Sequence, residues 1–384
     1  MHVLFIPKWY PGRNDPQLGD FLRKQAIAVS RTQQVTVLYV LGLKDPDAVA
    51  MNELDASDGP WELRCYFKAS THPWAVFRQP VNAWRHLRAT RKGWRQLTRE
   101  RGIPDVLHAH ILLRPALFAW VIRRIHGIPF LISEQSSEYL NGTFEARPWW
   151  KKWLAHRLLR SSNEVTAVSD YLGDRLKALG LVDRYEVVPN VVPGTDRPLP
   201  PRGEKGRFLM VADLVDRIKN VSGVLRALAT LVARYPEVQL TIIGDGPDRD
   251  RLEQLAHQLN VLDRVTFLGR LANSDVLDHM GRTGAVIINS HVETFSVVTG
   301  EGLAQGKPVI ATRCGGPIAF ITPENGFLIP VNDDNALVSA MARLMEQWDT
   351  FDPALIRASV QDRFGERAVG QAFVNLYERV RHGR

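Results

Sequence analysis

Two carboxylates, Glu293 and Glu301, stand eight positions apart, just after an apolar run at 285–289 that predicts a buried strand. A carboxylate at the end of a strand and another in the following helix would both face one edge of a sheet. A carboxylate can accept two hydrogen bonds from a vicinal diol, the group that a ribose or a hexose presents. The pair therefore predicts a site for a sugar-bearing ligand.

The helix that follows Glu293 has an amino terminus suited to anions. Thr294 or Ser296 could cap this helix. The backbone amides of Phe295, Ser296 and Val297 would then stay free to bind oxygens of a ligand. Carboxylates and amides together predict that sugar hydroxyls and phosphate bind at this strand end.

Two stretches of alternating strands and helices must position these groups. The first stretch predicts strands at 2–7, 34–41, 106–110, 130–133, 164–168 and 185–188, and helices at 20–30, 81–101, 115–126, 149–161 and 170–179. The second predicts strands at 208–211, 239–244, 265–268, 285–289 and 309–311, and helices at 221–235, 248–259 and 298–305. Such alternation is typical of α/β domains with doubly wound parallel sheets, which bind ligands at the carboxyl ends of their strands.

A segment rich in proline and glycine separates the two stretches. The 384 residues also exceed the ~250 to 300 at which a single hydrophobic core stops growing. We therefore expect an N-terminal domain at 1–190, a linker at 191–206 and a C-terminal domain at 207–365. A last helix at 366–384 is expected to pack back on a domain surface, and the active site to lie in the cleft between the domains.

The string from Glu293 to Thr312, ETFSVVTGEGLAQGKPVIAT, resembles the Glu-x7-Glu signature of family 4 glycosyltransferases. The resemblance spans nearly the whole chain and is strongest over 208–330. It implies a GT-B fold, with two Rossmann-like domains facing a central cleft, and sugar transfer to a hydroxyl with retention of configuration. In that family the match of Glu301 holds the ribose of the donor, and the match of Glu293 contacts the transferred sugar. The implied co-substrate is a UDP- or GDP-linked sugar, with no cofactor and no metal.

Further donor contacts follow from the same resemblance. The family has Gly-Arg-Leu followed by Lys-Gly, and the two cations neutralise the diphosphate of the donor. Here Lys219 matches the lysine, while Asp213 replaces the arginine. Arg217 is either the replacement cation or a solvated charge, and Gly244 ends a strand that would line the pocket of the nucleotide base.

The N-terminal half offers residues for the acceptor side. Gly12 and Gly19 in the first loop would let amides approach a phosphate, although a plain turn is the alternative. His110 ends a strand, as one or two histidines do in the family. Where the family has a sugar-contacting histidine, this chain has Gln135, which can donate a hydrogen bond but cannot carry a proton. Its neighbour Glu134 is either a base for the acceptor or a loop charge. The residues assigned to catalysis are Glu293, Lys219, Gln135, Glu134 and His110.

The net charge of +8 is concentrated in the N-terminal half. Residues 74–101 hold eight Lys or Arg and one acid, and residues 147–160 hold five and no acid, interleaved with Trp149, Trp150 and Trp153. These helices either lie on an anionic membrane or pack their apolar side on their own sheet while arginines face water. The expected partners are thus a nucleotide-sugar donor, a glycan or lipid-linked acceptor, and an anionic membrane surface.

Other classes of protein are disfavoured. No apolar run reaches the ~18 to 20 residues of a membrane-spanning helix, and the start lacks the features of a signal peptide. Cys65 and Cys314 offer no zinc site and fit a reducing compartment, so a cytoplasmic protein, peripheral on the inner face of the membrane, is expected. No Gly-x-Gly-x-x-Gly of a dehydrogenase follows the first strand. A nucleotide-sugar epimerase and a basic nucleic-acid-binding module stay open as alternatives, although no motif for specific nucleic-acid recognition is present.

Overall fold

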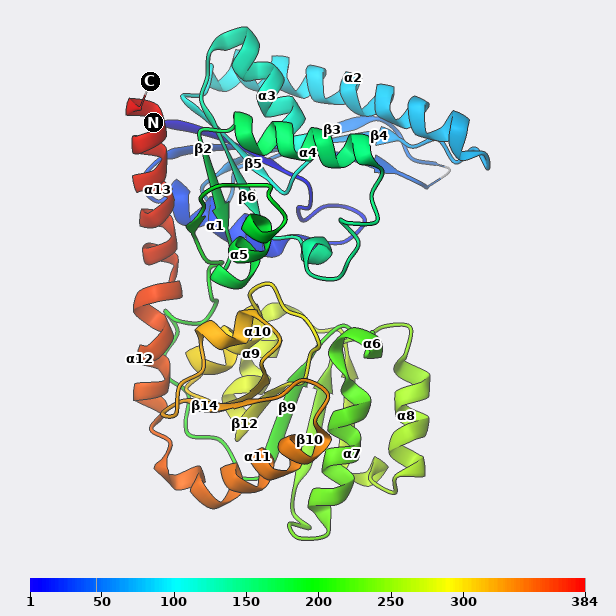
Figure 1. The fold of residues 1–384 in the computed structure, drawn as a ribbon, viewed down its shortest axis with the longest axis vertical. Helices are drawn as coiled ribbons and strands as arrows, with labels where there is room; N and C mark the ends of the chain where they lie inside the picture. Colours follow the sequence, from blue (N-terminus) through cyan, green and yellow to red (C-terminus); the bar gives the residue numbers. More distant parts are fainter. Residues whose placement is uncertain (46, 384) are drawn as a thin grey trace. The chain divides into compact units, whose positions relative to one another are not determined.

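The computed structural model describes residues 1–45 and 47–383, which form two compact units. The first contains residues 1–191 together with α13 (Glu366–His382), and the second contains residues 192–365. Each unit is a sheet covered by helices (Figure 1). The α/β fold class expected from the sequence is thus confirmed, with sheets of eight and six strands.

The sheet of the first unit has the strand order β3-β4-β2-β1-β5-β6-β7-β8. Its strands are β1 (His2–Pro7), β2 (Gln34–Leu43), β3 (Met51–Asp55), β4 (Trp61–Lys68), β5 (Val106–His110), β6 (Phe130–Glu134), β7 (Glu164–Ala167) and β8 (Glu186–Val187). Its helices, besides α13, are α1 (Asp20–Ser30), α2 (Ala75–Arg101), α3 (Arg114–His126), α4 (Trp149–Ser161) and α5 (Asp170–Ala178), with a 3-10 turn at Ser137–Tyr139. All neighbouring strands are parallel except β3, which is antiparallel to β4.

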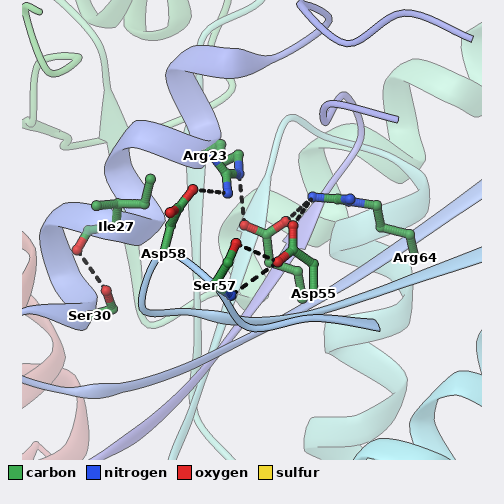
Figure 2. Close-up of polar contacts among 8 residues, drawn as sticks. Arg23, Ile27, Ser30, Asp55, Ser57, Asp58 and Arg64 are labelled. Atoms are coloured by element: carbon green, nitrogen blue, oxygen red, sulfur yellow. Dashed lines mark hydrogen bonds and ion pairs between the residues drawn. The ribbon is translucent and has the colours of Figure 1, made fainter. Parts of the chain in front are cut away.

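The β3–β4 hairpin is a feature that the sequence pattern did not predict. Glu62 of β4 is only 1% exposed, and Arg23 of α1 donates from Nε to its Oε1 at 2.9 Å. Figure 2 shows Arg23 also reaching Asp58 in the turn, at 2.6 Å, and Arg64 of β4 reaching Asp55 of β3. Arg64 pairs with Glu62 as well. A buried carboxylate is tolerated only when it is paired, so these arginines allow a charged strand to lie inside the fold.

The last helix, α13, completes the core of the first unit. Its apolar face packs with α1 and with the central strands through Val369, Phe373, Leu376, Tyr377 and Val380. The hydroxyl of Tyr377 lies 2.7 Å from Nδ1 of the buried His108. A Cβ at Gly370 would lie 2.6 Å from the carbonyl oxygen of Ala28 in α1, so glycine permits the close helix contact.

The sheet of the second unit is fully parallel, with the order β11-β10-β9-β12-β13-β14. The strands are β9 (Arg207–Val211), β10 (Gln239–Ile243), β11 (Val265–Gly269), β12 (Ala285–Ile288), β13 (Val309–Thr312) and β14 (Gly326–Ile329). The helices are α6 (Asp216–Lys219), α7 (Val221–Val232), α8 (Arg249–Gln258), α9 (Asn273–Arg282), α10 (Val297–Ala304), α11 (Asp334–Gln347) and α12 (Pro353–Phe364). This is the order of a dinucleotide-binding fold, whose ligands bind where the order reverses, between β9 and β12.

The segment predicted as a linker is packed on the second unit by two buried cations. Lys307, 1% exposed, donates from Nζ to the carbonyl of Pro201 at 2.7 Å, and burial lowers the pKa of this lysine to about 8. Arg357 donates to the carbonyls of Ala304 and Arg197, each at 2.6 Å. The lysine of the Gly-Lys-Pro string thus has a structural contact that its sequence motif did not suggest.

Candidate functional site

Lys219 and Glu293 form an ion pair at the carboxyl edge of the second sheet. Lys219 ends α6, after β9, and Glu293 lies in the loop after β12, the strand next to β9. Nζ of Lys219 lies 2.6 Å from Oε1 of Glu293, and the hydroxyl of Ser290 donates to the same oxygen at 2.8 Å. Burial works against the ammonium charge, but Glu293, followed by Asp213, outweighs it, so the pKa of Lys219 is raised. The lysine is a fixed cation at the point where the strand order reverses.

Backbone contacts fix the loop that carries Glu293. Its amide donates to the carbonyl of Cys314, and its carbonyl accepts from the amide of Gly316, each at 2.9 Å. A Cβ at Gly316 would lie 2.3 Å from the carbonyl of Phe295, so this approach requires glycine. The ring of Phe295 is buried against Phe320, with 4.9 Å between centroids. Only the backbone of Phe295 is left for the contact with a ligand that the sequence suggested.

Ser296 introduces α10 in an unusual conformation. Its φ of 70° is left-handed, which is uncommon for any residue but glycine. Its hydroxyl lies 2.8 Å from that of Thr299 and makes no hydrogen bond to an amide of the helix. Side-chain capping by Ser296 was therefore a wrong expectation. The amides of Val297 and Val298 precede the first hydrogen bonds of the helix, which the amides of Thr299 and Gly300 donate to the carbonyl of Ser296, so an anion can bind there.

Glu301 lies inside α10 and is 4% exposed. Nδ2 of Asn273, the first residue of α9, donates to its Oε1 at 2.7 Å. This amide orients the carboxylate, since an asparagine NH2 only donates and a carboxylate only accepts. Asn273 was missed from the sequence; the polar run Asn273-Ser274-Asp275, typical of a helix start, was the available signal.

The charges near β9 are balanced by a residue that the sequence did not single out. Asp213, where the family pattern has arginine, is exposed and lies 3.7 Å from Nη2 of Arg270, which follows β11. Arg217 in α6 is exposed, and its carbonyl accepts from Nδ1 of His291 at 2.8 Å. The ring of His291 therefore ties α6 to the loop after β12.

Gly244 joins three strand ends. Its amide donates to the carbonyl of Gly269 at 2.8 Å, and a Cβ on it would lie 1.9 Å from the carbonyl oxygen of Ala212. With a φ of 135°, the position requires glycine. The residue thus holds the ends of β9, β10 and β11 close together.

In the first unit, Glu134 ends β6 and is fully buried. Its Oε1 accepts from the amide of Leu112 at 2.8 Å and from the hydroxyl of Tyr139 at 3.1 Å. Its Oε2 has no hydrogen-bond partner among the described residues. Burial raises the pKa of Glu134 to about 7, against the lowering effect of the Leu112 amide. The loop-charge alternative for Glu134 is therefore wrong, because the side chain supports the loop after β5 from inside.

That loop is strained on both sides of Leu112. Ile111 and Leu113 have φ angles of 67° and 74°, and left-handed backbone is a clear outlier for a β-branched residue such as Ile111. Strained backbone persists only where its surroundings hold it. The hydrogen bond from Leu112 to Glu134 is one such restraint.

His110 ends β5 and is buried between aromatic rings. Its ring stacks on Phe5 with centroids 4.6 Å apart and lies 3.7 Å from the ring centroid of His108. Within the described residues neither ring nitrogen of His110 has a hydrogen-bond partner, and burial lowers its pKa to about 3. His110 is therefore neutral at physiological pH.

Gln135 is also buried, and its Nε2 donates to Gln25 of α1 at 3.3 Å. In the first loop, Gly12 uses its amide inside the loop, donating to Asp15 at 3.2 Å, so the free amide expected there is absent. Gly19 has a φ of 70°, and a Cβ on it would lie 2.5 Å from the carbonyl oxygen of Trp9. Both glycines shape the loop.

The predicted site residues fall into two groups. The second unit holds Lys219, Glu293, Glu301, Arg217, Gly244, Phe295, Ser296 and Val297. The first unit holds Gln135, Glu134, His110, Gly12 and Gly19. Over residues 1–45 and 47–383, no three His, Cys, Asp or Glu side chains gather as metal ligands would. No described helix has the length and apolar character needed to cross a bilayer.

Two family models match the chain. Residues 195–367 match the model described as "Glycosyl transferases group 1", and residues 30–191 match the "Glycosyl transferase 4-like domain". Together the two matches extend over most of both units.

Individual proteins are similar in sequence or in structure. The lipopolysaccharide core biosynthesis glycosyltransferase LpsD of Rhizobium meliloti (strain 1021) is 34% identical over 169 residues, which are 42% of this chain and 46% of LpsD. The match thus spans less than half of that relative. Sucrose-phosphate synthase from Thermosynechococcus elongatus superposes with a TM-score of 0.78 at 18% identity, over 100% of both chains. Anabaena HepE, solved in complex with UDP-glucose, gives a TM-score of 0.70 at 18% identity, over 98% of this chain and 99% of that one.

Proposed function

Because the chain belongs to the group 1 glycosyltransferases, with a family 4-like N-terminal domain and the GT-B fold, we propose that it transfers a sugar from a nucleotide diphosphate-sugar to a hydroxyl with retention of configuration. The observation that carries this proposal is the ion pair of Lys219 and Glu293, where the strand order of the second sheet reverses. It places a cation and a carboxylate beside the start of α10.

In this mechanism the leaving diphosphate binds to Lys219 and to the first amides of α10. Negative charge grows on the diphosphate as the bond to the sugar breaks, so positive groups already in place lower the barrier. Binding of phosphate to Lys219 would release Glu293 from its ion pair. The carboxylate would then accept hydrogen bonds from hydroxyls of the transferred sugar.

The nucleoside end of the donor is assigned to Glu301, which would accept hydrogen bonds from the two ribose hydroxyls. Asn273 orients this carboxylate at 2.7 Å. We favour a UDP-linked donor, because HepE was solved with UDP-glucose. A GDP-linked donor is the alternative.

The acceptor is proposed to be a glycan or a lipid-linked glycan presented at an anionic membrane. Support comes from α2 and α4, whose large side chains face outward: Trp84 is 59% exposed, Leu87 52% and Trp149 76%. Of α2 only Thr90, Gly93 and Leu97 are buried. The alternative holds in part, since α2 packs Gly93 and Leu97 on its own sheet, but Trp84 and Trp149 stay exposed.

The charge of this surface matches an anionic membrane. We define the basic aromatic face as the exposed Trp, Lys and Arg side chains of α2, α3 and α4. These three helices contain a single acidic residue, Glu100. Tryptophan and arginine together favour the boundary of an anionic bilayer.

A test of donor binding uses the whole chain and the nucleotides UDP, GDP and ADP. We expect UDP to raise the melting temperature, and Glu301→Ala to weaken UDP binding by roughly tenfold or more, the scale of a lost charge-assisted hydrogen bond. Glu237→Ala, which removes an exposed carboxylate of the same unit, is the matched control. If no nucleotide diphosphate stabilises the protein, or if Glu301→Ala binds UDP as the parent does, the proposed function is wrong.

The nucleotide-sugar epimerase is distinguished by incubating the protein with UDP-glucose and no acceptor. An epimerase would accumulate an isomerised sugar nucleotide. The proposed transferase would leave the sugar unchanged or release it slowly to water.

A further inference from the structure

The first unit contains a cavity of about 220 Å³ at the carboxyl ends of β1 and β2, between α2 and α3. Its walls are mainly apolar and include Leu38, Val40, Leu112 and Phe118. Sites for whole small molecules usually measure ~300 to 1,000 Å³, so this cavity fits one part of a larger ligand. Because β5 and β6 also end at this edge, the cavity lies on the side of the sheet where acceptor residues are expected.

Two cations line the cavity, Lys8 after β1 and Arg114 at the start of α3. Nζ of Lys8 lies 4.9 Å from the ring centroid of Trp9. In the described part of the chain neither cation forms an ion pair, and no acidic residue lines the cavity, although Lys8 lies near enough to the buried Glu134 to lower the pKa of that carboxyl. Two cations beside a mainly apolar wall match a ligand that joins an anionic group to an apolar body.

His86 of α2, which lines the cavity together with Thr90, carries no charge near neutral pH. Burial, followed by the charge of Arg114, lowers the pKa of His86 to about 4. The fixed positive charge is therefore supplied by Lys8 and Arg114.

Two features of the backbone restrain the wall formed by Leu112 and Leu113. Leu113 has a left-handed φ, and Leu112 donates its amide to the buried Glu134. Strain of this kind collects at ligand sites, where it fixes a wall before the ligand arrives. The cavity is thus bounded by a restrained loop.

We propose that this cavity binds the phosphate-bearing end of a lipid acceptor, with Lys8 and Arg114 contacting the phosphate and the first part of the hydrocarbon chain entering between α2 and α3. The inference rests on the proposed function and adds the chemical class of the acceptor. The same helix α2 carries the exposed Leu87 together with Trp84 of the basic aromatic face, so a chain that leaves the cavity meets an apolar surface.

Farnesyl phosphate is a suitable probe, because it joins one phosphate to a short hydrocarbon chain and disperses without a bilayer. Its binding to the full chain is followed by tryptophan fluorescence, since Trp9 lies beside Lys8. Farnesol and inorganic phosphate are tested in parallel. We expect saturable binding of farnesyl phosphate, and at least tenfold weaker binding of each of the other two.

Two variants locate the binding. Lys8→Ala combined with Arg114→Ala should weaken farnesyl phosphate binding by roughly tenfold or more, the scale of lost charge-assisted contacts. Val40→Phe, which fills the apolar part, should weaken it similarly. Arg184→Ala removes another exposed guanidinium of the same unit and should bind the probe as the parent does.

Several outcomes would overturn the inference. These are no saturable binding by the parent, unchanged binding in both cavity variants, or equal binding of inorganic phosphate, which would indicate an anion site without a lipid. UDP binding measured on the same samples separates the two proposals: protein that binds UDP but not farnesyl phosphate contradicts only the acceptor class. Protein that binds farnesyl phosphate but no nucleotide contradicts the proposed function.

Discussion

Polar side chains at the carboxyl edges of the two sheets differ in whether they have ion-pair or hydrogen-bond partners. In the second unit the charged groups are paired: Lys219 with Glu293, and Asp213 with Arg270. In the first unit His110 and Glu134 are buried with polar atoms that have no hydrogen-bond partner among the described residues.

The two edges are therefore suited to different kinds of ligand group. An ion pair can exchange one partner for a ligand of the same charge, so the second edge is suited to an anionic donor. Neutral buried groups cannot compensate a charged ligand in that way, and they instead fix backbone shape. In the first edge the neutral groups therefore fix backbone shape and leave the charge to Lys8 and Arg114, whereas the second edge holds its charges in ion pairs.

The largest expected effect concerns the charge of the second edge. Lys219→Ala should lower kcat by about 10² to 10³, the usual loss when one preorganised charge stabiliser of a transition state is removed. The measurement is turnover of the sugar nucleotide under saturating conditions. Lys205→Ala, at an exposed lysine of the same unit, is the control. Turnover within threefold of the parent would remove the contrast between the two edges.

The next effect concerns the buried carboxylate of the first edge. The pKa of Glu134, about 7 in the folded protein, lies above the ordinary value of 4.5. A raised pKa means that protonation favours the folded state, so the contribution of Glu134 to stability is present at low pH and is lost as the pH rises through about 7. Between pH 5 and 8 the loss should be about 2.5 kcal/mol.

Glu134→Gln should abolish this pH dependence, because the amide keeps an acceptor for Leu112 and does not titrate. Urea unfolding at pH 5, 6.5 and 8 measures the free energy of unfolding of both proteins. Glu237→Gln serves as the exposed control. Parallel pH profiles for the parent and Glu134→Gln would show that Glu134 behaves like the paired carboxylates of the second unit.

The helices of the two units also differ in whether their arginines are paired with acids, and we expect this difference to give the smallest effect, on binding to membranes. In the second unit Arg226 of α7 pairs with Asp334, and Arg251 of α8 with Asp216. The basic aromatic face of the first unit has almost no acids. Trp149→Ser combined with Trp153→Ser should therefore reduce binding to vesicles of phosphatidylglycerol and phosphatidylcholine by about tenfold.

Leu355→Ser, at a residue of the second unit that is 63% exposed, should leave vesicle binding unchanged. Sedimentation with vesicles at low and high salt is the measurement. Equal loss in both variants, or binding that ignores the anionic lipid, would contradict a membrane role for α4.

Elements with regular apolar periodicity were predicted closely from the sequence. The strand at 106–110 and the helix at 149–161 have the expected bounds. The β3–β4 hairpin was not predicted, because the buried Glu62 breaks the alternation of apolar and polar residues and its partner Arg23 is distant in the sequence. The start of α2 was predicted six residues late, at Val81, whereas the helix begins at Ala75 and contains Pro80.

The candidate site divides in the same way. The string from Glu293 to Glu301 is continuous, so its residue types alone indicated a polar site in the second unit. Asn273 and Arg270 were not predicted as site residues, because their contacts with Glu301 and Asp213 join segments that are distant in the sequence. In the first unit the sequence named Glu134, but its burial follows from tertiary packing, which residue types do not reveal.

The position of α13 has a consequence for synthesis on the ribosome. The helix lies against α1, yet its codons are translated only after those of the whole second unit. While the second unit is still being made, the face of α1 that carries Leu22, Ala26 and Val29 has no cover from α13. The core of the first unit therefore stays incompletely packed, with an apolar surface accessible to chaperones, until α13 has been synthesised.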